Sequence, residues 1–376
     1  MHPGLIAAAV VGAVMLLVTL ADVFVTIFNY DGFTFVTPRV HRATWHVVRV
    51  LTSPLPQRSR HAALSIASAA LLPATVAGWL ALELSAFALL YLPGLADGSF
   101  RLGRGLHANA GTAWYFSAGD VSSLTFGDVV ARTAIYRTLA DLETVIGLAT
   151  VGLAVAYVLS ALDALGSLNQ LHGRVRRQAT TPNNPATIIA RHFNAGQVSE
   201  LSGLLESFAE DLESYDQGLR RYPVVFYFHT RRAERSIPRV FAALGDLIEL
   251  LRWGLPPCQP LTASPYLLAL TDEYNGTVGR LQRSFVGPPG DPAPDPLPEP
   301  EFWCQYRRPS PSDPMIAGFR SVCEQAREAS GTDDDGSSPE AMTYRRYTEW
   351  LQFHCRRRVI IDRVATALGY PASVAS

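Results

Sequence analysis

Three long apolar stretches before residue 165 constrain the fold of this chain more than any other feature of its sequence. They cover Leu5–Phe28, Leu64–Leu92 and a third region that begins near Ala134 and is uncharged over Thr144–Leu162. A membrane-spanning helix needs about 20 predominantly apolar residues, because the hydrocarbon core of a bilayer is about 30 Å thick. The sequence therefore predicts an integral membrane protein with three spanning helices.

The first stretch admits a second interpretation, a cleaved signal peptide. Such a peptide starts with a positively charged segment and has a shorter apolar core. In this chain the charged start is missing, and the apolar run continues to Phe28 with Asp22 as its one interruption. We therefore expect a retained helix. Pro73 in the second stretch is compatible with a kinked membrane helix, because such helices tolerate proline.

Loop charges predict the orientation of these helices. The segment between the first two stretches carries five arginines and one acidic residue, Asp31. Three more arginines, between residues 174 and 177, follow the third stretch, whereas the arginines of residues 93–133 are balanced by aspartates. Positively charged loops tend to stay in the cytoplasm. We therefore expect a multi-pass protein of the plasma (inner) membrane, with the N-terminus and residues 93–133 outside and the C-terminal half in the cytoplasm.

The segment between the second and third stretches is too polar and too short to span a bilayer. It opens with the aromatic residues Trp114, Tyr115 and Phe116, and it ends in a tight turn at Gly127. A half-length helix that enters the membrane and returns as extended chain fits this pattern. Non-helical backbone at that depth occurs only where it is buried in protein or lines a water-filled path. The sequence thus predicts a re-entrant pore loop.

This segment resembles the pore of the potassium channel family. The family signature is roughly Tyr/Trp-Phe-Ser, a short pore helix and then Thr-Val-Gly-Tyr-Gly-Asp. Tyr115-Phe116-Ser117 match the start, and Ser123-Leu124-Thr125-Phe126-Gly127-Asp128 fall on the filter. Downstream, Leu139–Glu143 and then Gly147 resemble the start of the family's inner helix. The resemblance covers about residues 64–165 and implies a prokaryotic two-helix pore closed by four copies of the loop, with Ser123 to Gly127 conducting potassium and, if selectivity is weak, sodium.

Thr125 departs from the family pattern, because it stands where the family has its first filter glycine. Such a filter points successive backbone carbonyls at the pore axis, where they replace the ion's hydration shell. Glycine supplies the positive φ that this arrangement needs, whereas a β-branched residue with positive φ is strained. We expect either a strained backbone or a wider, wetter filter lined by the threonine hydroxyl. The second outcome would weaken the selectivity among cations.

Polar residues around the filter are candidates for its support. Asp120 lies in the expected pore helix, and a carboxylate at membrane depth indicates a function. We expect it to accept hydrogen bonds behind the filter, together with Ser122, or to add negative potential to the pore. Asp128 stands at the expected outer mouth, where acidic rings concentrate cations.

Several residues of the spanning helices have structural interpretations. We expect Glu143 and Arg137 to form an interfacial ion pair and Glu83 to pair with the pore helix or a nearby arginine. Gly147 and Gly152 of the third helix are possible hinges, but small residues also serve close helix packing. Packing is the interpretation that we favour.

The rest of the chain has the pattern of an all-helical domain. We divide the chain into residues 1–62 (first helix and basic loop), 63–170 (pore domain) and 171–376 (helical cytosolic domain with a proline-rich loop near 287–300). Apolar residues spaced three to four apart predict helices at Gln197–Arg220, Ile237–Trp253, Leu267–Phe285 and Pro339–Leu368. Tyr222–Phe228 is ambiguous. No GxGxxG motif marks a dinucleotide-binding unit.

These features favour a channel for monovalent cations and give no support for an enzyme. The four cysteines lack the spacing of a zinc site, so we expect no cofactor or metal besides the permeant ions. A net charge of −1 gives no basic surface for nucleic acid. The expected partners are further copies of the chain, most simply in a homotetramer, the lipid bilayer, and an unidentified ligand or protein at the helical domain. The alternative is a non-conducting membrane sensor or scaffold that reuses the pore fold.

Overall fold

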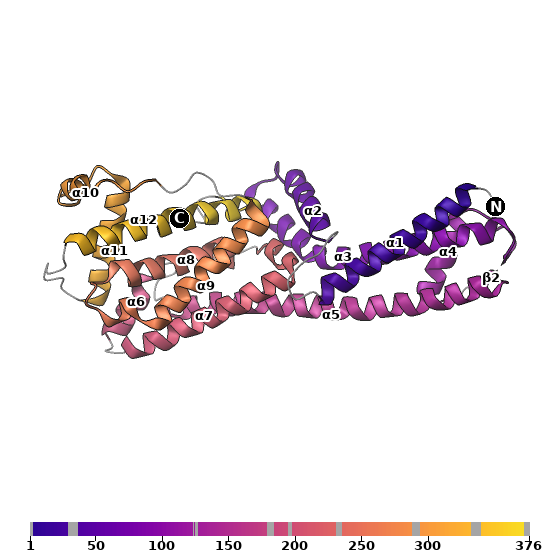
Figure 1. Ribbon diagram of the computed structural model, residues 1–376, viewed down its shortest axis with the longest axis horizontal. Coiled ribbons are helices and arrows are strands. Elements are labelled where there is room, and N and C mark those ends of the chain that lie inside the picture. Colours follow the sequence, from indigo (N-terminus) through magenta and orange to yellow (C-terminus); the bar gives the residue numbers. More distant parts are fainter. Residues whose placement is uncertain are drawn as a thin grey trace. The chain divides into compact units, whose positions relative to one another are not determined.

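A computed structural model describes residues 3–28, 37–122, 124, 127–178, 184–194, 198–230, 235–287, 294–331 and 340–371 (Figure 1). Two compact units are present. Unit 1 consists of Met1–Pro56, Ala63–Asp163 and Gly218–Phe228, and unit 2 of Gln57–Ala62, Ala164–Gln217 and His229–Ser376.

The described elements are helical apart from one short two-stranded sheet. In the first part of the chain they are α1 (Pro3–Phe28), α2 (Thr37–Leu51), α3 (Gln57–Ala96), β1 (Phe100–Leu102), α4 (Ala110–Val121), β2 (Val129–Ala131) and α5 (Ala134–Gln178). They continue with α6 (Ala186–Asn194), α7 (Val198–Arg221), η1 (Pro223–Tyr227), α8 (Ile237–Glu249), η3 (Leu250–Gly254), η4 (Pro260–Ala263), α9 (Pro265–Leu281), η5 (Gln282–Val286), α10 (Glu299–Tyr306), α11 (Pro314–Ser330) and α12 (Glu340–Leu368).

Three of the described helices, α1, α3 and α5, are long and apolar enough to cross a membrane. They confirm the three predicted spanning helices. Helix α3 is longer than the predicted Leu64–Leu92, because it continues through Pro93 at one end and includes polar turns from Gln57 at the other. Hydropathy marks only the part of a helix that matches the bilayer, whereas backbone hydrogen bonds continue beyond it.

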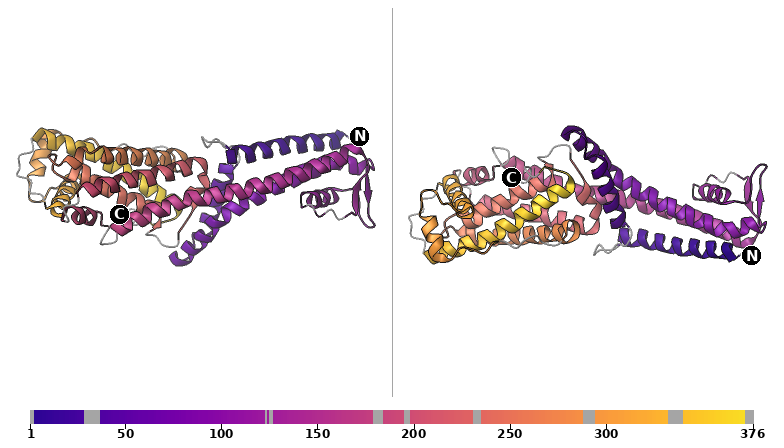
Figure 2. Two further views of the ribbon diagram at one scale, coloured as in Figure 1. Left: turned by 90° about the horizontal axis from the view of Figure 1, so that it is seen from below. Right: turned by 90° about the horizontal axis from the view of Figure 1, so that it is seen from above.

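Helix α1 runs beside α3 (Figure 2) and approaches it closely at Gly12. Its buried residues include Gly12, Leu16, Thr19 and Val23, which lie three or four positions apart on one face. At Gly12 the two backbones approach so closely that a β-carbon there would lie 2.7 Å from the Ala86 carbonyl oxygen. Such contacts between small residues and backbone are typical of membrane helix pairs. The opposite face of α1 exposes large apolar side chains, as expected of a helix that faces lipid.

Helix α2 lies in the basic loop, where we predicted no helix. His41 and Trp45 are buried on one side of it. The Trp45 ring packs on Tyr227 of η1 with centroids 5.8 Å apart, and η1 is the segment Tyr222–Phe228 that the sequence left ambiguous. Burial lowers the pKa of His41 to about 4, although nearby Asp22 opposes the shift. The helix was missed because its apolar residues form two separate faces.

A two-stranded antiparallel sheet, formed by the strands before and after α4, was also not predicted. Strands β1 and β2 are antiparallel, with Phe100 opposite Ala131 and Leu102 opposite Val129. The Gly103 amide extends the pairing by donating to the Asp128 carbonyl at 2.6 Å. Three-residue strands are too short for a period-two pattern to emerge from the sequence. The pairing of β1 with β2 connects the chain before α4 to the chain after it.

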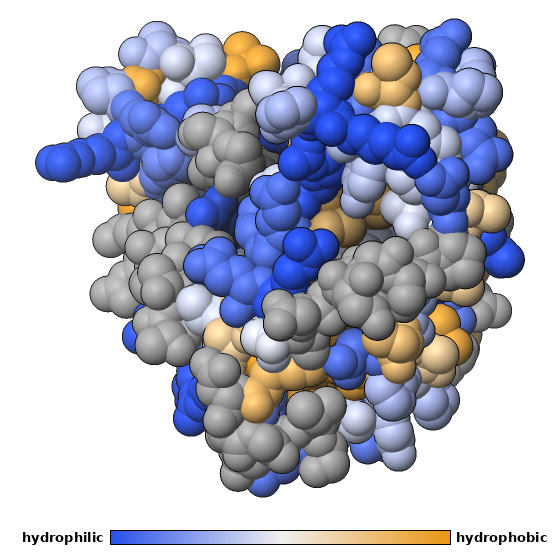
Figure 3. Space-filling view, turned by 90° about the vertical axis from the view of Figure 1, so that its left-hand side faces the viewer, coloured by the Kyte–Doolittle hydropathy of each residue, from blue (hydrophilic) through white to orange (hydrophobic). Residues whose placement is uncertain are grey.

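Unit 2 is built from helices. The four helices predicted in this half are present as α7, α8 with η3, α9 with η5, and α12, and α6, α10 and α11 are added to them. Figure 3 shows one end of this unit, where hydrophilic surface surrounds scattered hydrophobic patches. Of the predicted proline-rich loop, residues 288–293 lie outside the described part of the chain.

A buried polar cluster on Glu249 links α8 to α12. The Glu249 carboxylate accepts hydrogen bonds from Trp350 Nε1 at 3.0 Å, His354 Nδ1 at 3.0 Å and Arg357 Nε at 2.6 Å. Arg357 also donates to Asp246 at 2.5 Å. Burial by itself would raise the pKa of Glu249, but the hydrogen bond from His354 and the charge of Arg357 outweigh it and hold that pKa below its usual value.

Candidate functional site

The half-length helix α4 is the centre of the candidate site. Asn109 precedes the helix and caps it, since its side chain accepts from the Thr112 amide at 2.9 Å. Ser122 follows the last helical residue, and its hydroxyl donates back to the Ala118 carbonyl at 2.7 Å. In the view of Figure 1, α4 appears between α3 and α5, and Figure 2 shows that it lies to one side of these two helices. This is the half-length re-entrant helix predicted from the sequence.

Ser117 attaches α4 to both long helices of the pore unit. Its hydroxyl lies 3.0 Å from the Leu84 carbonyl of α3 and within hydrogen-bond distance of Glu143 Oε1 of α5. The second oxygen of Glu143 accepts from the Tyr91 hydroxyl of α3 at 2.6 Å. Ser117, Tyr91 and Glu143 are each 0% exposed. A buried polar group needs such partners, so these contacts fix the position of α4.

These contacts correct one prediction. Glu143 was expected to pair with Arg137 at the interface, but it bonds to Tyr91 and Ser117 instead. Arg137 Nε donates to the Ala131 carbonyl of β2 at 3.0 Å. The two side chains are six positions apart on α5, so they point in different directions around the helix.

Glu83 also has a different partner from the expected one. Thr150 of α5 donates to Glu83 Oε1 at 2.7 Å, so the carboxylate joins α3 to α5. Among the described residues it bonds to neither the pore helix nor an arginine. Asp22, the one charge in the first apolar stretch, is buried and accepts from Trp79 Nε1 at 3.2 Å.

An aromatic cluster packs the β1–β2 sheet against α4. The Phe116 ring contacts Tyr91 and Phe100 with centroids 5.0 and 5.3 Å apart, and Phe100 contacts Tyr136 at 5.1 Å. Edge-to-face and tilted rings at these distances are favourable. Tyr91 therefore belongs both to this cluster and to the Glu143 network. Sequence reasoning missed it, although a tyrosine inside a long apolar stretch is the signal that would have pointed to it.

The structure describes two residues of the predicted filter, Leu124 and Gly127. Ser123, Thr125 and Phe126 lie outside the described residues, so their predicted roles stay predictions. The Leu124 amide donates to the Gly119 carbonyl at 3.0 Å, and its side chain is 64% exposed. Gly127 has φ +77°, a conformation in which a residue with a side chain is strained. The turn that closes the predicted filter therefore requires this glycine.

Asp128 and Tyr115 connect the end of this segment to α4. The Tyr115 hydroxyl donates to Asp128 Oδ2 at 3.1 Å. The Asp128 carbonyl in turn accepts the Gly103 amide, which leaves little room for a side chain at Gly103. Asp128, the residue predicted at the outer mouth, is thus bonded both to α4 and to the residue that follows β1.

Asp120 faces a cavity of about 410 Å³ that also adjoins Tyr115, Gly127, Asp128, Arg137 and Asp141. Its side chain is buried, and Oδ2 has no hydrogen-bond partner among the described residues. Thr144 of α5 donates to its backbone carbonyl at 3.2 Å. The structure therefore brings Asp120, Gly127 and Asp128 to one cavity. The Ser122 hydroxyl, in contrast, bonds within α4.

The two glycines proposed as hinges have different surroundings. A β-carbon at Gly147 would lie 3.0 Å from Val121 Cγ1, so this glycine allows α5 to pack closely on the end of α4. A β-carbon at Gly152 would have no neighbour within 4 Å. The geometry favours the packing interpretation at Gly147.

Helix α5 leaves a long apolar face without a partner in the described part of one chain. Its exposed residues recur every three or four positions and lie on neighbouring turns of the helix. They are Leu142, Val145, Leu148, Val151, Val155, Leu159 and Leu162.

Comparison with known proteins agrees with this geometry. A family model described as "Ion channel" matches residues 78–164, which run from the middle of α3 through α4 to the membrane part of α5. This part of the chain is an ion-channel domain, as the resemblance to potassium channel pores implied.

A protein of Bacillus subtilis (strain 168), "Uncharacterized membrane protein YdjJ", is 22% identical over 142 residues. The match covers 38% of this chain and 41% of that protein, so the chain spans less than half the length of this relative. No solved structure matches the chain.

Proposed function

Taking residues 78–164 as an ion-channel domain, we propose that this chain is one subunit of a homo-oligomeric channel for monovalent cations. Ions pass along Ser123–Gly127, and α5 lines the inner cavity. Potassium permeates, as in the family that the pore resembles, and sodium permeates with it because the departure at Thr125 weakens the selectivity. The N-terminus lies outside the cell, and unit 2 lies in the cytoplasm, where it binds an unidentified ligand or protein and sets the state of the pore.

The observation that carries this proposal is the attachment of α4 between two membrane-spanning helices. Ser117 contacts both α3 and α5, and the chain returns from α4 through Gly127 to Asp128, which Tyr115 holds. A half-length helix followed by non-helical backbone is stable at membrane depth only inside protein or beside water. An ion path provides that surrounding.

The proposed assembly rests on the exposed face of α5. One re-entrant loop cannot enclose a path, whereas four related loops form the ring of carbonyl oxygens that potassium filters use. The apolar residues of α5 from Leu142 to Leu162 provide a surface that neighbouring subunits bury. The outward face of α1 then remains for lipid.

Thr125 is proposed to widen the filter and to weaken the discrimination between potassium and sodium. Replacing Thr125 with glycine restores the freedom of backbone that a narrow carbonyl filter needs. We predict that Thr125→Gly raises the ratio of potassium to sodium permeability, measured from reversal potentials in planar bilayers.

Thr133→Gly is the matched control, because Thr133 is exposed and lies outside the filter. It should leave the permeability ratio unchanged. A ratio that is the same in Thr125→Gly and in the unmodified channel would contradict the assignment of Thr125 to the filter.

A further inference from the structure

Four carboxylates are buried in the described part of unit 1, one each on α1, α3, α4 and α5. They are Asp22, Glu83, Asp120 and Glu143. Those on α1, α3 and α5 each accept a hydrogen bond from a side chain of a neighbouring helix. The Asp120 carboxylate accepts none from the described residues, and its Oδ2 is shielded from solvent. A buried carboxylate at membrane depth is costly without a partner, so a ligand that supplies this partner is expected.

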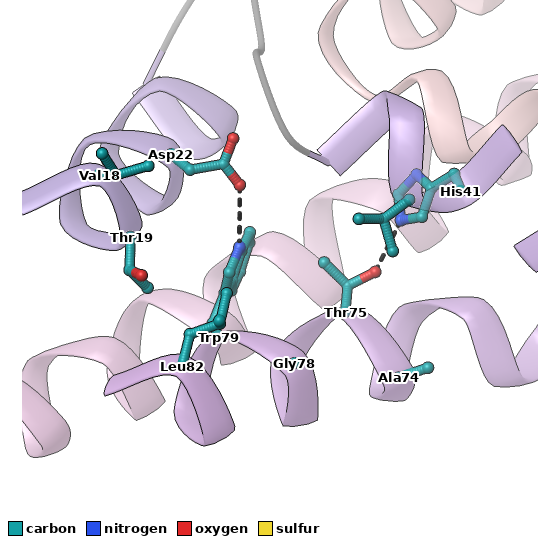
Figure 4. Close-up of a pocket in the computed structure, with 10 residues that line it drawn as sticks. Val18, Thr19, Asp22, His41, Ala74, Thr75, Gly78, Trp79 and Leu82 are labelled. Carbon is teal, nitrogen blue, oxygen red and sulfur yellow. Dashed lines mark hydrogen bonds between the residues drawn. The ribbon is translucent and has the colours of Figure 1, made fainter. Parts of the chain in front are cut away.

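A cavity between α1, α2 and α3 shows how such groups are satisfied elsewhere in unit 1. It has a volume of about 80 Å³ and adjoins Asp22, His41, Thr75 and Trp79. Figure 4 shows Trp79 directed at Asp22, and the hydrogen bond between His41 and Thr75. These polar groups bond to one another, so this cavity does not require a charged ligand.

Asp120, by contrast, lies in the wall of a larger cavity with a volume of about 410 Å³. Its walls come from α4, from the segment between Gly127 and Ala131, and from α5 near Ala140, which all belong to unit 1. Small-molecule sites in proteins have volumes of about 300–1,000 Å³. The cavity therefore has the size of a ligand site.

The described residues that line this cavity carry a negative net charge. Besides Asp120 they include Asp128 and Asp141, against one guanidinium, that of Arg137. Arg137 Nε donates to the Ala131 carbonyl at 3.0 Å, and Arg137 forms no ion pair with a described carboxylate. Asp141 adds to the negative potential at Asp120. Opposite charges attract strongly away from bulk water, so the cavity favours a cation.

A metal ion would lack ligands in this cavity. In the part of the chain that the structure describes, no three carboxylate, histidine or cysteine side chains lie close enough to share one. Calcium takes about six to eight oxygen ligands, and magnesium requires a nearly octahedral set. An alkylammonium group carries three N–H donors instead, which one carboxylate together with water or backbone carbonyls can accept.

The rest of the wall suits the apolar part of an organic cation. It includes the Phe116 ring of α4, the buried side chains of Val129 and Ala131 in β2, and Ala140 of α5. Each CH₂ group that is buried against such a wall strengthens binding about fourfold. A short alkyl chain attached to the ammonium group therefore adds to the affinity.

We propose that this cavity binds a small alkylammonium ion, with its ammonium group on the Asp120 carboxylate and its alkyl chain against Phe116 and β2. Among the described residues of the proposed ion path, the cavity adjoins Gly127 alone, so the ligand lies beside that path. Binding can therefore be measured whether or not the pore conducts, and a failure of this proposal is distinct from a failure of the channel function.

Isothermal titration calorimetry of the full chain in phosphatidylcholine nanodiscs tests this proposal. The probe is butylammonium chloride, and the matched neutral compound is butyramide, which has N–H donors and a similar chain but no charge. In sodium phosphate buffer, with the heats of empty nanodiscs subtracted, we expect butylammonium to bind at least about tenfold more tightly than butyramide. Equal affinities, or no binding of butylammonium, would overturn the proposal.

Asp120→Asn identifies the group that holds the ammonium ion. The substitution preserves the size of the side chain and removes its charge, so butylammonium should bind at least about tenfold more weakly. Asp97→Asn is the matched control, because Asp97 is exposed and does not line the cavity; it should leave the affinity unchanged. An unchanged affinity in Asp120→Asn would overturn the proposal, as would equal weakening in both variants, which would show an effect of total charge alone.

The length of the alkyl chain tests the apolar part of the site. Propylammonium has one CH₂ group fewer than butylammonium, so it should bind about fourfold more weakly. An affinity that does not depend on chain length would contradict the placing of the chain against Phe116 and β2.

A larger side chain at Ala140 narrows the cavity and leaves every charge in place. Ala140→Leu should therefore weaken the binding of butylammonium. The control is Ala134→Leu, because Ala134 is exposed at the start of α5 and does not line the cavity. An Ala140→Leu protein that binds as tightly as this control would contradict the placing of the ligand in this cavity.

Discussion

Removing the hydroxyl of Tyr91 should destabilise the attachment of α4 without disturbing the surrounding packing. Tyr91→Phe keeps the ring, and with it the contacts to Phe116 and Phe100 at 5.0 and 5.9 Å. It removes the donor that lies 2.6 Å from Glu143 Oε2. The substitution therefore changes one hydrogen bond and leaves the buried apolar area nearly as it was.

The size of the effect follows from burial. Hydrogen bonds between membrane helices contribute on average about 0.6 kcal/mol, because the separated helices find other partners. Leaving a buried acceptor unsatisfied in the folded protein costs more, about 1–3 kcal/mol. Tyr91 and Glu143 are each 0% exposed, so no water can replace the lost donor. We therefore expect Tyr91→Phe to lower the free energy of unfolding by about 1–3 kcal/mol.

The assay is denaturant unfolding in bicelles, combined with a double-mutant cycle between Tyr91→Phe and Glu143→Gln. If the two side chains interact as the structure shows, the effects of the two substitutions should be non-additive. Tyr136→Phe is the control, because the Tyr136 ring belongs to the same cluster but its hydroxyl makes no hydrogen bond with the described residues. A Tyr91→Phe protein as stable as the Tyr136→Phe control, or additive effects in the cycle, would refute the reasoning.

Two further predictions concern α5 and unit 2. Gly147→Leu should destabilise the protein by about 1–3 kcal/mol, because the new side chain overlaps Val121. Gly152→Leu should be tolerated, because no atom lies within 4 Å of a β-carbon there. Unfolding midpoints in bicelles measure both effects, and equal effects would contradict the packing role of Gly147. Glu249→Gln should lower the thermal unfolding midpoint at neutral pH. The folded pKa of Glu249 lies below its usual value, so its stabilisation is complete above that usual value and is lost as the pH falls through the folded pKa. The difference between the variant and the unmodified protein should therefore shrink in acid, and a constant difference would contradict this account.

The membrane helices and the pore helix could be predicted from the sequence because a bilayer restricts both. A spanning helix must be apolar over its whole membrane length, and this identified α1, α3 and α5. The re-entrant segment from α4 to the turn at Gly127 could be predicted because it is too polar and too short to span the bilayer. Non-helical backbone at membrane depth must be buried in protein or line a water-filled path.

Side-chain partners within the pore unit could not be predicted in the same way. A carboxylate next to an arginine in sequence suggests an ion pair, and this led to the wrong pairing of Glu143 with Arg137. The true partners, Tyr91 and Ser117, are 52 and 26 positions away and meet Glu143 only when three helices pack. Helix α2 was missed for a related reason, since one of its apolar faces contacts protein and the other is exposed.

Ion flux into proteoliposomes tests the central claim most directly. The purified full chain is reconstituted, and the uptake of potassium, sodium and a large organic cation is compared with that of protein-free vesicles. We predict uptake of potassium and sodium with little preference between them, and exclusion of the organic cation. Strong preference for potassium would contradict the proposed widening at Thr125. No uptake of any cation, by a protein shown to be folded and inserted, would contradict the channel function and favour a non-conducting membrane sensor.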